Sequence, residues 1–279
     1  MLDVFGSVVV ASQYRPHAPD EEQALADWVR DAGIFQALYL KRRPQEARHR
    51  ANIAPDEVAP KSAFWGMSVE SVTVEEQGVA FDIRPGNGLS VGLYLDARDA
   101  RRFVREHARG HNVLNLFAYT CGFGLAASLG GARRAVNVDS SRKVLDWGQA
   151  NYRLNALVPS PKDFIAADAF DFLKLGQKKG DLFDFVVLDP PSFATTKKSR
   201  FSAAKDYGAL VASALGVCAP KATLLTCCNL ETMSGPTFRQ LVLDRCRAKN
   251  PSVVAQFGAS SIDFKQPSAL KVIALRLGQ

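Results

Sequence analysis

From about residue 96 to the end of the chain, short apolar runs alternate with stretches in which apolar residues recur at helical spacing. The apolar runs predict seven strands, at residues 112–117, 135–139, 164–168, 183–189, 222–228, 253–258 and 269–277. Helices are predicted between the first six, at residues 123–129, 141–154, 169–175, 203–218 and 236–248. Such alternation is typical of βαβ units, and therefore of an α/β fold with helices on both faces of a parallel sheet. No helix-length segment separates the last two runs, so we expect them to pair antiparallel and close the sheet.

Residues 1–95 show a different pattern and are predicted to form a small α+β accessory domain that recognises the substrate. Apolar residues at helical spacing predict an amphipathic helix over residues 21–32, and residues 33–40 are typical of a strand. Two alternating runs, residues 69–75 and 79–83, flank Gln77-Gly78, which indicates a hairpin. Residues 41–61 are rich in charge, Pro and Ala and are expected to form a mobile loop. The second domain is then residues 96–279.

Composition narrows the class of protein only modestly. The 279 residues, 47% of them hydrophobic, suffice for a full core, and no apolar stretch is long enough to span a bilayer. The start of the chain lacks the pattern of a signal peptide, and the five cysteines and four histidines show neither a disulfide framework nor metal-ligand spacing. We therefore expect a cytoplasmic protein without a metal ion. The net charge of +7 weakly favours a polyanionic partner such as nucleic acid.

Carboxylates stand where three of the predicted strands end, at Asp139, Asp168 and Asp189. The first strand is followed instead by a turn that contains Gly122 and Gly124. Because parallel strands end at one edge of a sheet, these residues are predicted to surround a crevice for a nucleoside cofactor. Glycine lets the backbone approach the cofactor closely, Asp139 is placed for the ribose diol, and Asp168, with the Ala169 backbone, for the adenine amine. A Gly-x-Gly pair without the acids would indicate only a turn.

The segment Asp189-Pro-Pro-Ser-Phe193 indicates what the crevice does. Its two prolines fix a loop after the fourth strand, so that the Asp189 carboxylate and the Pro190 carbonyl face the reacting group. Phe193 is then positioned to stack on a planar acceptor. Asp-Pro also opens ordinary turns, which is the alternative interpretation. Dehydrogenases have no use for this element, and the order of the parts is similar to that of S-adenosylmethionine-dependent methyltransferases.

Three segments narrow this resemblance: Gly92-Leu-Tyr-Leu-Asp-Ala-Arg98, Leu114-Asn-Leu-Phe-Ala-Tyr-Thr-Cys-Gly-Phe123 and Asp189-Pro-Pro-Ser-Phe193. From about residue 69 to the end, the chain resembles the bacterial large-subunit ribosomal RNA methyltransferases, which include cytosine-C5 and guanine-N7 enzymes. The resemblance implies a Rossmann-like seven-stranded sheet, S-adenosyl-L-methionine as cofactor and RNA as partner. It also implies cofactor contacts from Tyr94, Arg98, Phe117, Ala118, Tyr119, Thr120, Gly122, Asp139, Ser140, Asp168, Ala169 and Asp189. For the first segment, the alternative is a strand whose Asp96 caps a helix beginning near Ala97.

The chain departs from the pattern of that family at three points. The RNA-binding PUA domain that usually precedes the accessory region is expected to be absent, and Cys121 and Ala97 replace a usual Gly and a usual Gln. The third departure concerns the nucleophile, since cytosine-C5 enzymes need a cysteine thiolate to activate C5. In Thr226-Cys-Cys-Asn-Leu230, a gap-free alignment puts Asn229 at that position, as in guanine-N7 enzymes, and a one-residue slip puts Cys228 there. We favour Asn229 and direct attack by a ring nitrogen.

Basic residues form three groups: Lys41, Arg42 and Arg43 with Arg48 and Arg50; Arg98, Arg101, Arg102 and Arg105; and Lys197, Lys198 and Arg200. We expect the second group to be a solvated face. The third follows the Asp-Pro-Pro segment and is placed to contact an RNA backbone. The sequence thus predicts a methyltransferase that acts on a base of ribosomal or other structured RNA. The alternatives are a small-molecule or peptide methyltransferase and a non-catalytic cofactor- or RNA-binding scaffold.

Overall fold

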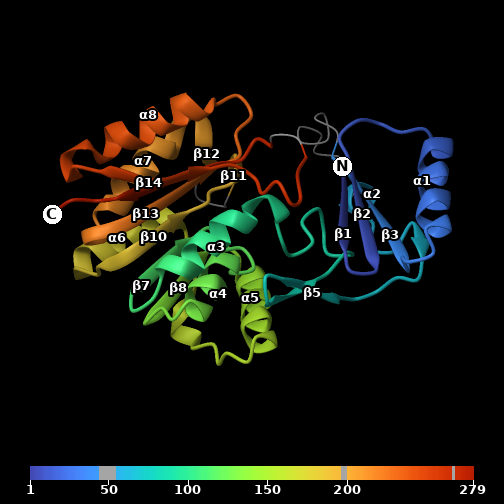
Figure 1. Ribbon diagram of the computed structural model, residues 1–279, viewed down its shortest axis with the longest axis horizontal. Helices are drawn as coiled ribbons and strands as arrows, with labels where there is room; N and C mark the ends of the chain where they lie inside the picture. Colours follow the sequence, from blue (N-terminus) through green and yellow to red (C-terminus); the bar gives the residue numbers. More distant parts are fainter. Residues whose placement is uncertain (44–54, 196–199, 266–267) are drawn as a thin grey trace. The chain divides into compact units, whose positions relative to one another are not determined.

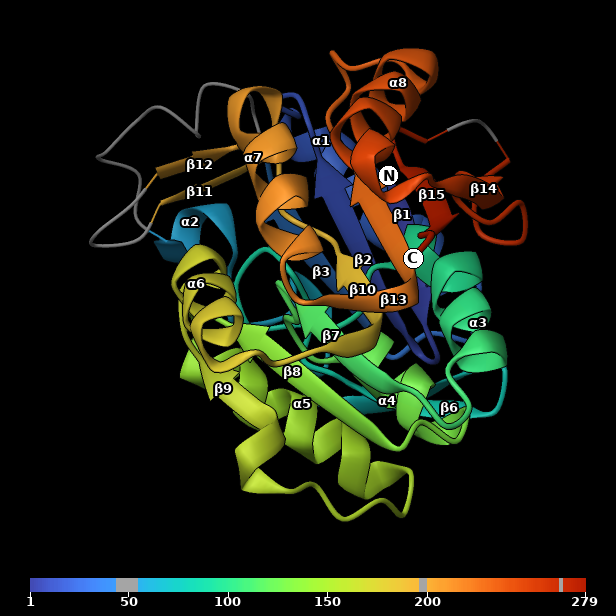
Figure 2. The same ribbon diagram turned by 90° about the vertical axis from the view of Figure 1, so that its left-hand side faces the viewer.

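The computed structural model describes residues 1–43, 55–195, 200–265 and 268–279. They form two compact units, Met1–Leu93 and Tyr94–Gln279 (Figure 1, Figure 2). The larger unit is built on a seven-stranded sheet in the order β14-β15-β13-β10-β7-β8-β9. These strands are β7 (Asn112–Leu116), β8 (Arg134–Asp139), β9 (Phe164–Ala166), β10 (Phe183–Leu188), β13 (Cys218–Cys228), β14 (Ser252–Phe257) and β15 (Lys271–Arg276).

The strand directions give this sheet one functional edge. Strands β13, β10, β7, β8 and β9 pair parallel to one another, and β15 pairs antiparallel with both β13 and β14. The predicted α/β fold and the antiparallel closure of the sheet are therefore confirmed. Since β13 and β14 both run opposite to β15, β14 is parallel to the other five strands. Six strands thus end at the same edge, which we call the carboxyl edge.

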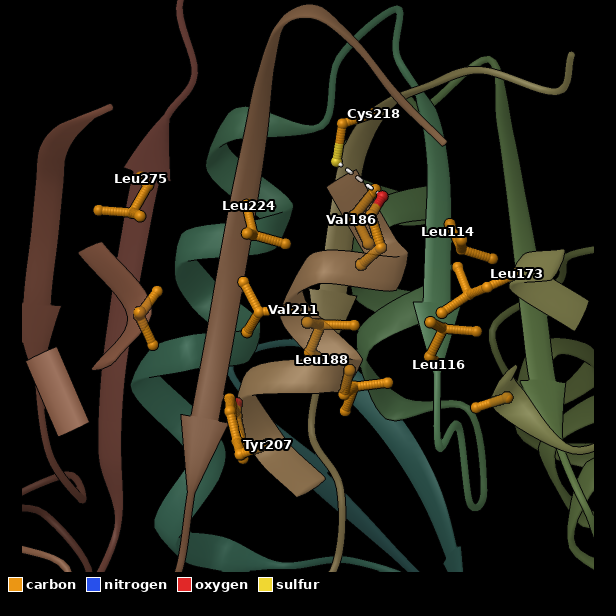
Figure 3. Close-up of a cluster of buried hydrophobic side chains, with 14 of the residues drawn as sticks. Leu114, Leu116, Leu173, Val186, Leu188, Tyr207, Val211, Cys218, Leu224 and Leu275 are labelled. Carbon is orange, nitrogen blue, oxygen red and sulfur yellow. Dashed lines mark hydrogen bonds between the residues drawn. The ribbon is translucent and has the colours of Figure 1, made fainter. Parts of the chain in front are cut away.

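Six helices cover the two faces of the sheet: α3 (Arg98–His107), α4 (Gly122–Leu129), α5 (Arg142–Leu154), α6 (Ala169–Lys179), α7 (Ala203–Leu215) and α8 (Gly235–Cys246). On one face, Leu114, Val186 and Leu188 pack against α6 and α7 (Figure 3). On the other face, Val113 and Phe185 pack against α3 and α4. Adjacent residues of the central strands are both buried, which is why their sequences are mostly apolar.

The smaller unit contains a four-stranded sheet with α1 (Pro19–Asp31) packed on one face. Its strands are β1 (Leu2–Phe5), β2 (Val8–Gln13), β3 (Ala37–Arg42) and β4 (Trp65–Gly66), and a separate hairpin comprises β5 (Val72–Glu76) and β6 (Val79–Ile83). The predicted helix and hairpin are confirmed, whereas β1 and β2 were not predicted. The strand predicted from residue 33 begins only at Ala37, because Gly33, with φ of +68°, bonds back to the Arg30 carbonyl at the end of α1.

Two residues of the first predicted basic group lie in a strand rather than in the expected loop, whereas Arg43 follows that strand. Lys41 and Arg42 belong to β3, and the side chain of Lys41 is fully buried. Burial, together with the charge of Arg43, lowers the pKa of Lys41 to about 8. Arg48 and Arg50 lie outside the described residues, and the short helix α2 (Pro55–Val58) follows.

The segment after the Asp-Pro-Pro motif was expected to be a loop, but it forms a hairpin. Strands β11 (Phe193–Thr195) and β12 (Arg200–Ser202) pair antiparallel. Lys197 and Lys198 lie outside the described residues, so their contact with RNA stays a prediction. Within the described part of the chain, no helix is both long enough and apolar enough to cross a membrane.

Candidate functional site

The turn between β7 and α4 has an uncommon backbone. Phe117, Tyr119 and Cys121 have φ values of 57°, 48° and 63°, in the left-handed region that non-glycine residues rarely adopt. Each such residue costs roughly 1–3 kcal/mol, so its surroundings must enforce the conformation. Backbone that alternates in this way forms a concave nest of N–H groups suited to an anion. The turn therefore fits a cofactor carboxylate. Gly122 is the first residue of α4, directly after this turn, and its close approach to the cofactor stays a prediction.

Hydrogen bonds from neighbouring elements hold this turn in place. The Tyr119 N–H donates to Oδ2 of Asp139 at 2.9 Å, which joins the turn to the end of β8. The Asn151 side chain of α5 donates to the Thr120 carbonyl at 3.0 Å. Helix α5 also approaches the turn closely, since a Cβ added to Gly148 would stand 2.3 Å from Sγ of Cys121. The turn is thus held by residues of two consecutive βα units, β7–α4 and β8–α5.

A buried polar network lies beneath the turn. The Asn115 amide donates to Oδ1 of Asn137 at 2.9 Å, and the Asn137 amide donates to the Tyr152 hydroxyl at 3.1 Å. Gly124 packs directly on this network, because an added Cβ would stand 2.0 Å from the same Oδ1 atom. The glycine predicted to approach the cofactor therefore serves close packing between α4 and β8. The network fixes the relative positions of β7, β8 and α5.

Asp139 ends β8, as the sequence predicts, and its side chain is partly buried. Its Oδ1 accepts the Ser141 N–H at 2.9 Å, while its Oδ2 holds Tyr119. Burial raises the pKa of Asp139, and the backbone hydrogen bonds from Ser141, Tyr119 and Ser140 oppose that effect. Each carboxylate oxygen has capacity for a second bond, so the group fits a ribose diol. That role of Asp139, with the exposed Ser140 beside it, remains a prediction.

Asp168 has a structural role as the cap of α6. Its Oδ1 accepts the Phe170 N–H at 2.9 Å and the Asp171 N–H at 3.3 Å. The following residue, Ala169, is buried. Both residues stand at the carboxyl edge after β9, and their contact with adenine remains a prediction.

Sequence reasoning missed Phe201 of β12, because no motif marks it. The centroid of its ring lies 5.8 Å from that of Phe117 in the turn between β7 and α4.

Tyr94 lies against the cofactor turn. Its ring centroid is 5.5 Å from that of Tyr119, and its side chain is about half exposed. The Tyr94 carbonyl accepts a hydrogen bond from Nη1 of Arg101 at 2.9 Å. Arg101 was expected on a solvated face but is buried at 5% exposure, so that expectation is wrong for this residue. The cofactor-proximal position that the resemblance implied for Tyr94 is compatible with this geometry.

Arg98 makes a bidentate ion pair with an acid that the sequence did not reveal. Its Nε donates to Oδ2 of Asp263 at 2.5 Å and its Nη2 to Oδ1 at 2.7 Å. The two side chains are 15% and 13% exposed. Arg98 is the first residue of α3, and Asp263 belongs to the segment between β14 and β15. The structure thus gives the Arg98 guanidinium a carboxylate partner within the protein.

Asp189 follows β10 in a strongly desolvating environment. Burial and the negative charge of Asp96 raise the pKa of Asp189 to about 7, against the opposing effect of Arg101. Burial also raises the pKa of Asp96. The adjacent Pro190 is buried, whereas Phe193 is 64% exposed. Near neutral pH the Asp189 carboxyl can therefore donate or accept a hydrogen bond, and Phe193 follows it by four residues in the chain.

The thiols at the end of β13 are not set up as nucleophiles. Cys227 and Cys228 are 0% and 1% exposed, and burial raises the pKa of both thiols, with the charge of Asp189 adding to the effect. Reactive cysteines are accessible and have a lowered pKa. Asn229, the first residue after β13, is exposed. Across the described residues, no three His, Cys, Asp or Glu side chains are grouped to hold a metal ion.

Comparisons with known sequences agree with this geometry. A sequence model of the S-adenosylmethionine-dependent methyltransferase family matches residues 3–257. Ribosomal RNA large subunit methyltransferase I of Aeromonas salmonicida is 40% identical over 175 residues, covering 63% of this chain and 44% of the relative. Its namesake from Photobacterium profundum is 34% identical over 248 residues, covering 87% and 60%. This chain spans about half the length of these curated relatives.

Two solved structures share the fold. A putative methyltransferase complexed with SAH (S-adenosylhomocysteine) superimposes with a TM-score of 0.86 at 24% identity, covering 99% of this chain and 71% of the other. The M. jannaschii tRNA m1G37 methyltransferase superimposes with a TM-score of 0.67 at 12% identity, covering 100% and 72%. At these identities the likeness concerns the fold alone, and it agrees with the seven-stranded sheet.

Removal of the Asp139 carboxylate is expected to weaken S-adenosylmethionine binding by about 1–3 kcal/mol, because a buried hydrogen-bonding partner is lost. Calorimetric titration of Asp139→Ala measures the change. Since Asp139 also holds Tyr119, the titration is repeated with S-adenosylhomocysteine and its 2′-deoxy analogue. The parent should bind the deoxy analogue more weakly, and the variant should not distinguish the two ligands. If the deoxy analogue binds more weakly than S-adenosylhomocysteine by the same factor in the parent and in the variant, Asp139 does not contact the diol.

The raised pKa of Asp189 makes stability depend on pH. A carboxyl whose pKa lies near 7 when folded, against about 3.9 unfolded, holds its proton more tightly in the folded state. Ionisation therefore destabilises the fold progressively from about pH 4 to pH 7. Asp189→Asn abolishes this titration. The free energy of unfolding of the variant minus that of the parent should therefore be larger at pH 8 than at pH 4, by at least about 1 kcal/mol. Urea unfolding at both pH values checks this, and a difference independent of pH would contradict it.

Proposed function

Because the chain belongs to the family of S-adenosylmethionine-dependent methyltransferases, we propose that it methylates a base in ribosomal or other structured RNA. The names of the curated relatives support an RNA acceptor. We place the reaction in the cytoplasm, in keeping with five cysteines that form no disulfide. The observation that carries the proposal is the exposed Phe193, four residues after Asp189, a carboxyl at the carboxyl edge whose pKa is raised to about 7.

When bound, S-adenosylmethionine supplies an electrophilic methyl group. The turn of residues 117–121 suits the carboxylate of its tail, since its left-handed residues form an anion-binding nest. Asp139 suits the ribose diol and Asp168 the adenine amine, because they end neighbouring strands on one side of the turn. Tyr94 packs against Tyr119 of the turn and is proposed to cover one side of the bound cofactor. These residues bind and orient the cofactor in the proposed function.

The acceptor is proposed to be an unstacked, planar base. An exposed aromatic ring such as Phe193 gains about 1–3 kcal/mol by stacking on a base. The two prolines after β10 hold the chain between Asp189 and this ring in a fixed course. The Asp189 carboxyl and the Pro190 carbonyl then orient the edge of the base. The net charge of +7 adds attraction for the RNA backbone.

The proposed chemistry is direct attack by a ring nitrogen. Its lone pair forms the new N–C bond as the carbon–sulfur bond breaks, and S-adenosylhomocysteine leaves. No enzyme nucleophile is needed, which agrees with the buried, neutral thiols of Cys227 and Cys228. Asn229, exposed where β13 ends, is available to hydrogen-bond the base edge.

The function is tested with RNA from a strain that lacks the gene. The protein is incubated with this RNA and methyl-labelled S-adenosylmethionine, and digested nucleosides are identified by mass spectrometry. We expect one base methylated on a ring nitrogen, and a rate at least about 100-fold lower in Asp189→Ala, because the acceptor loses its orientation. RNA from the parent strain, already methylated, is the control. A protein that binds the cofactor but labels no nucleoside would favour a small acceptor instead.

The two cysteines are expected to be dispensable for methyl transfer. Cys227→Ala and Cys228→Ala should each retain activity within about threefold, since a ring nitrogen needs no thiolate adduct. RNA containing 5-fluorocytosine traps such an adduct, and denaturing electrophoresis reveals it. We expect no trapped complex. A complex that forms with the parent and disappears in Cys228→Ala would restore the cytosine-C5 mechanism.

A further inference from the structure

The Arg98–Asp263 ion pair joins two segments that are 165 residues apart in the sequence. Both side chains are at most 15% exposed and the contact is bidentate, unlike a typical surface salt bridge. Loss of one partner from such a site leaves the other charge desolvated and uncompensated. The pair therefore fixes residues 258–264 to the start of α3.

Residues 258–264 stand at the carboxyl edge because they follow the end of β14, which runs parallel to β13. Figure 1 shows this red segment beside the green segment that leads into α3. Ser260, itself buried, organises the turn: its carbonyl accepts the N–H groups of Asp263 at 3.2 Å and Phe264 at 3.0 Å. Asp263 thereby faces Arg98, whereas Ile262 is 73% exposed.

Asp263 links residues 258–264 to the carboxyls of the candidate site. Its partner Arg98 begins α3, two residues after Asp96. Asp263 also acts on Asp96, since its negative charge adds to burial in raising the pKa of that carboxyl. Asp96 in turn acts on Asp189. The segment is thus linked, through Arg98 and Asp96, to Asp189, the carboxyl assigned to the acceptor.

We propose that residues 258–264, which we call the acceptor loop, form one wall of the acceptor entrance, with Asp263 as the positioning residue that fixes them through Arg98. Ile262 provides the apolar contact of the loop with the acceptor base. The inference rests on the proposed function, because the occupant of the entrance is taken to be a base. The family resemblance implied that Arg98 contacts the cofactor. In this proposal Arg98 instead holds the acceptor loop in place.

Steady-state methylation of RNA from the deletion strain and calorimetry with S-adenosylhomocysteine test the acceptor loop. Asp263→Asn and Ile262→Ser are expected to raise the KM for RNA at least about tenfold, while the Kd for S-adenosylhomocysteine stays within about twofold. The double variant Arg98→Asp/Asp263→Arg should recover part of the loss. The matched control is Asp99→Asn, which removes the exposed Asp99–Arg102 pair on the same helix and should leave both values unchanged.

The outcomes separate this inference from the proposed function. An unchanged KM, or a Kd for S-adenosylhomocysteine weakened as much as the KM, would overturn the role of the loop. Ile262 is exposed, so Ile262→Ser keeps the test valid even where Asp263→Asn does not fold. A parent protein that binds S-adenosylhomocysteine but methylates no RNA would refute the function alone. In that case, hydrogen exchange of the Arg98→Lys, Asp263→Asn and parent proteins tests the loop. Faster exchange of residues 258–264 in the variants than in the parent supports the role of the ion pair. Equal exchange rates overturn it.

Discussion

The left-handed backbone of the cofactor turn is the constraint on which the rest of the site depends. Three non-glycine residues, Phe117, Tyr119 and Cys121, adopt a conformation that each would avoid in isolation. The turn persists because Asp139 binds its Tyr119 N–H and because α5, free of a side chain at Gly148, packs against Cys121. The same carboxylate that we assign to the ribose diol therefore also shapes the nest for the cofactor tail. One interaction therefore joins the two halves of the proposed cofactor site, before any ligand arrives.

A second constraint is the density of acids at the carboxyl edge. Burial and the charge of Asp96 raise the cost of ionising Asp189, while burial and the charge of Asp263 raise the cost of ionising Asp96. The buried guanidinium of Arg101 offsets these effects only in part. Such an arrangement sacrifices folding stability, as functional sites commonly do. Its chemical result is a carboxyl that can accept a hydrogen bond or donate one near pH 7. A nucleobase edge carries donors and acceptors side by side, so this versatility suits such an acceptor.

The sequence predicts features that depend on local periodicity, and it misses those that depend on distant contacts. The central strands are predictable because both of their faces are buried, and Asp139 and Asp189 are found because parallel strands must end at one edge. Arg101 was assigned to solvent because its neighbours are basic, although helix packing buries it. Asp263 has no motif, since its partner lies 165 residues earlier. The left-handed Cys121 likewise follows from packing against α5, which no local pattern reveals.

The register of β13 explains why a one-residue shift matters for the mechanism. Successive side chains of a strand face opposite sides of the sheet, so Cys227 lies in the core beneath α3 and α4, whereas Cys228 lies in the core beneath α7 and α8. Neither core gives a thiol access to a base in the entrance. Asn229 is the first residue beyond the strand and the first that is exposed. Because β13 and β10 pair parallel, Asn229 and Asp189 follow the ends of neighbouring strands. In the proposed function, an exposed amide at this position favours attack by the acceptor itself, whereas a one-residue shift that put Cys228 there would favour attack by a thiolate.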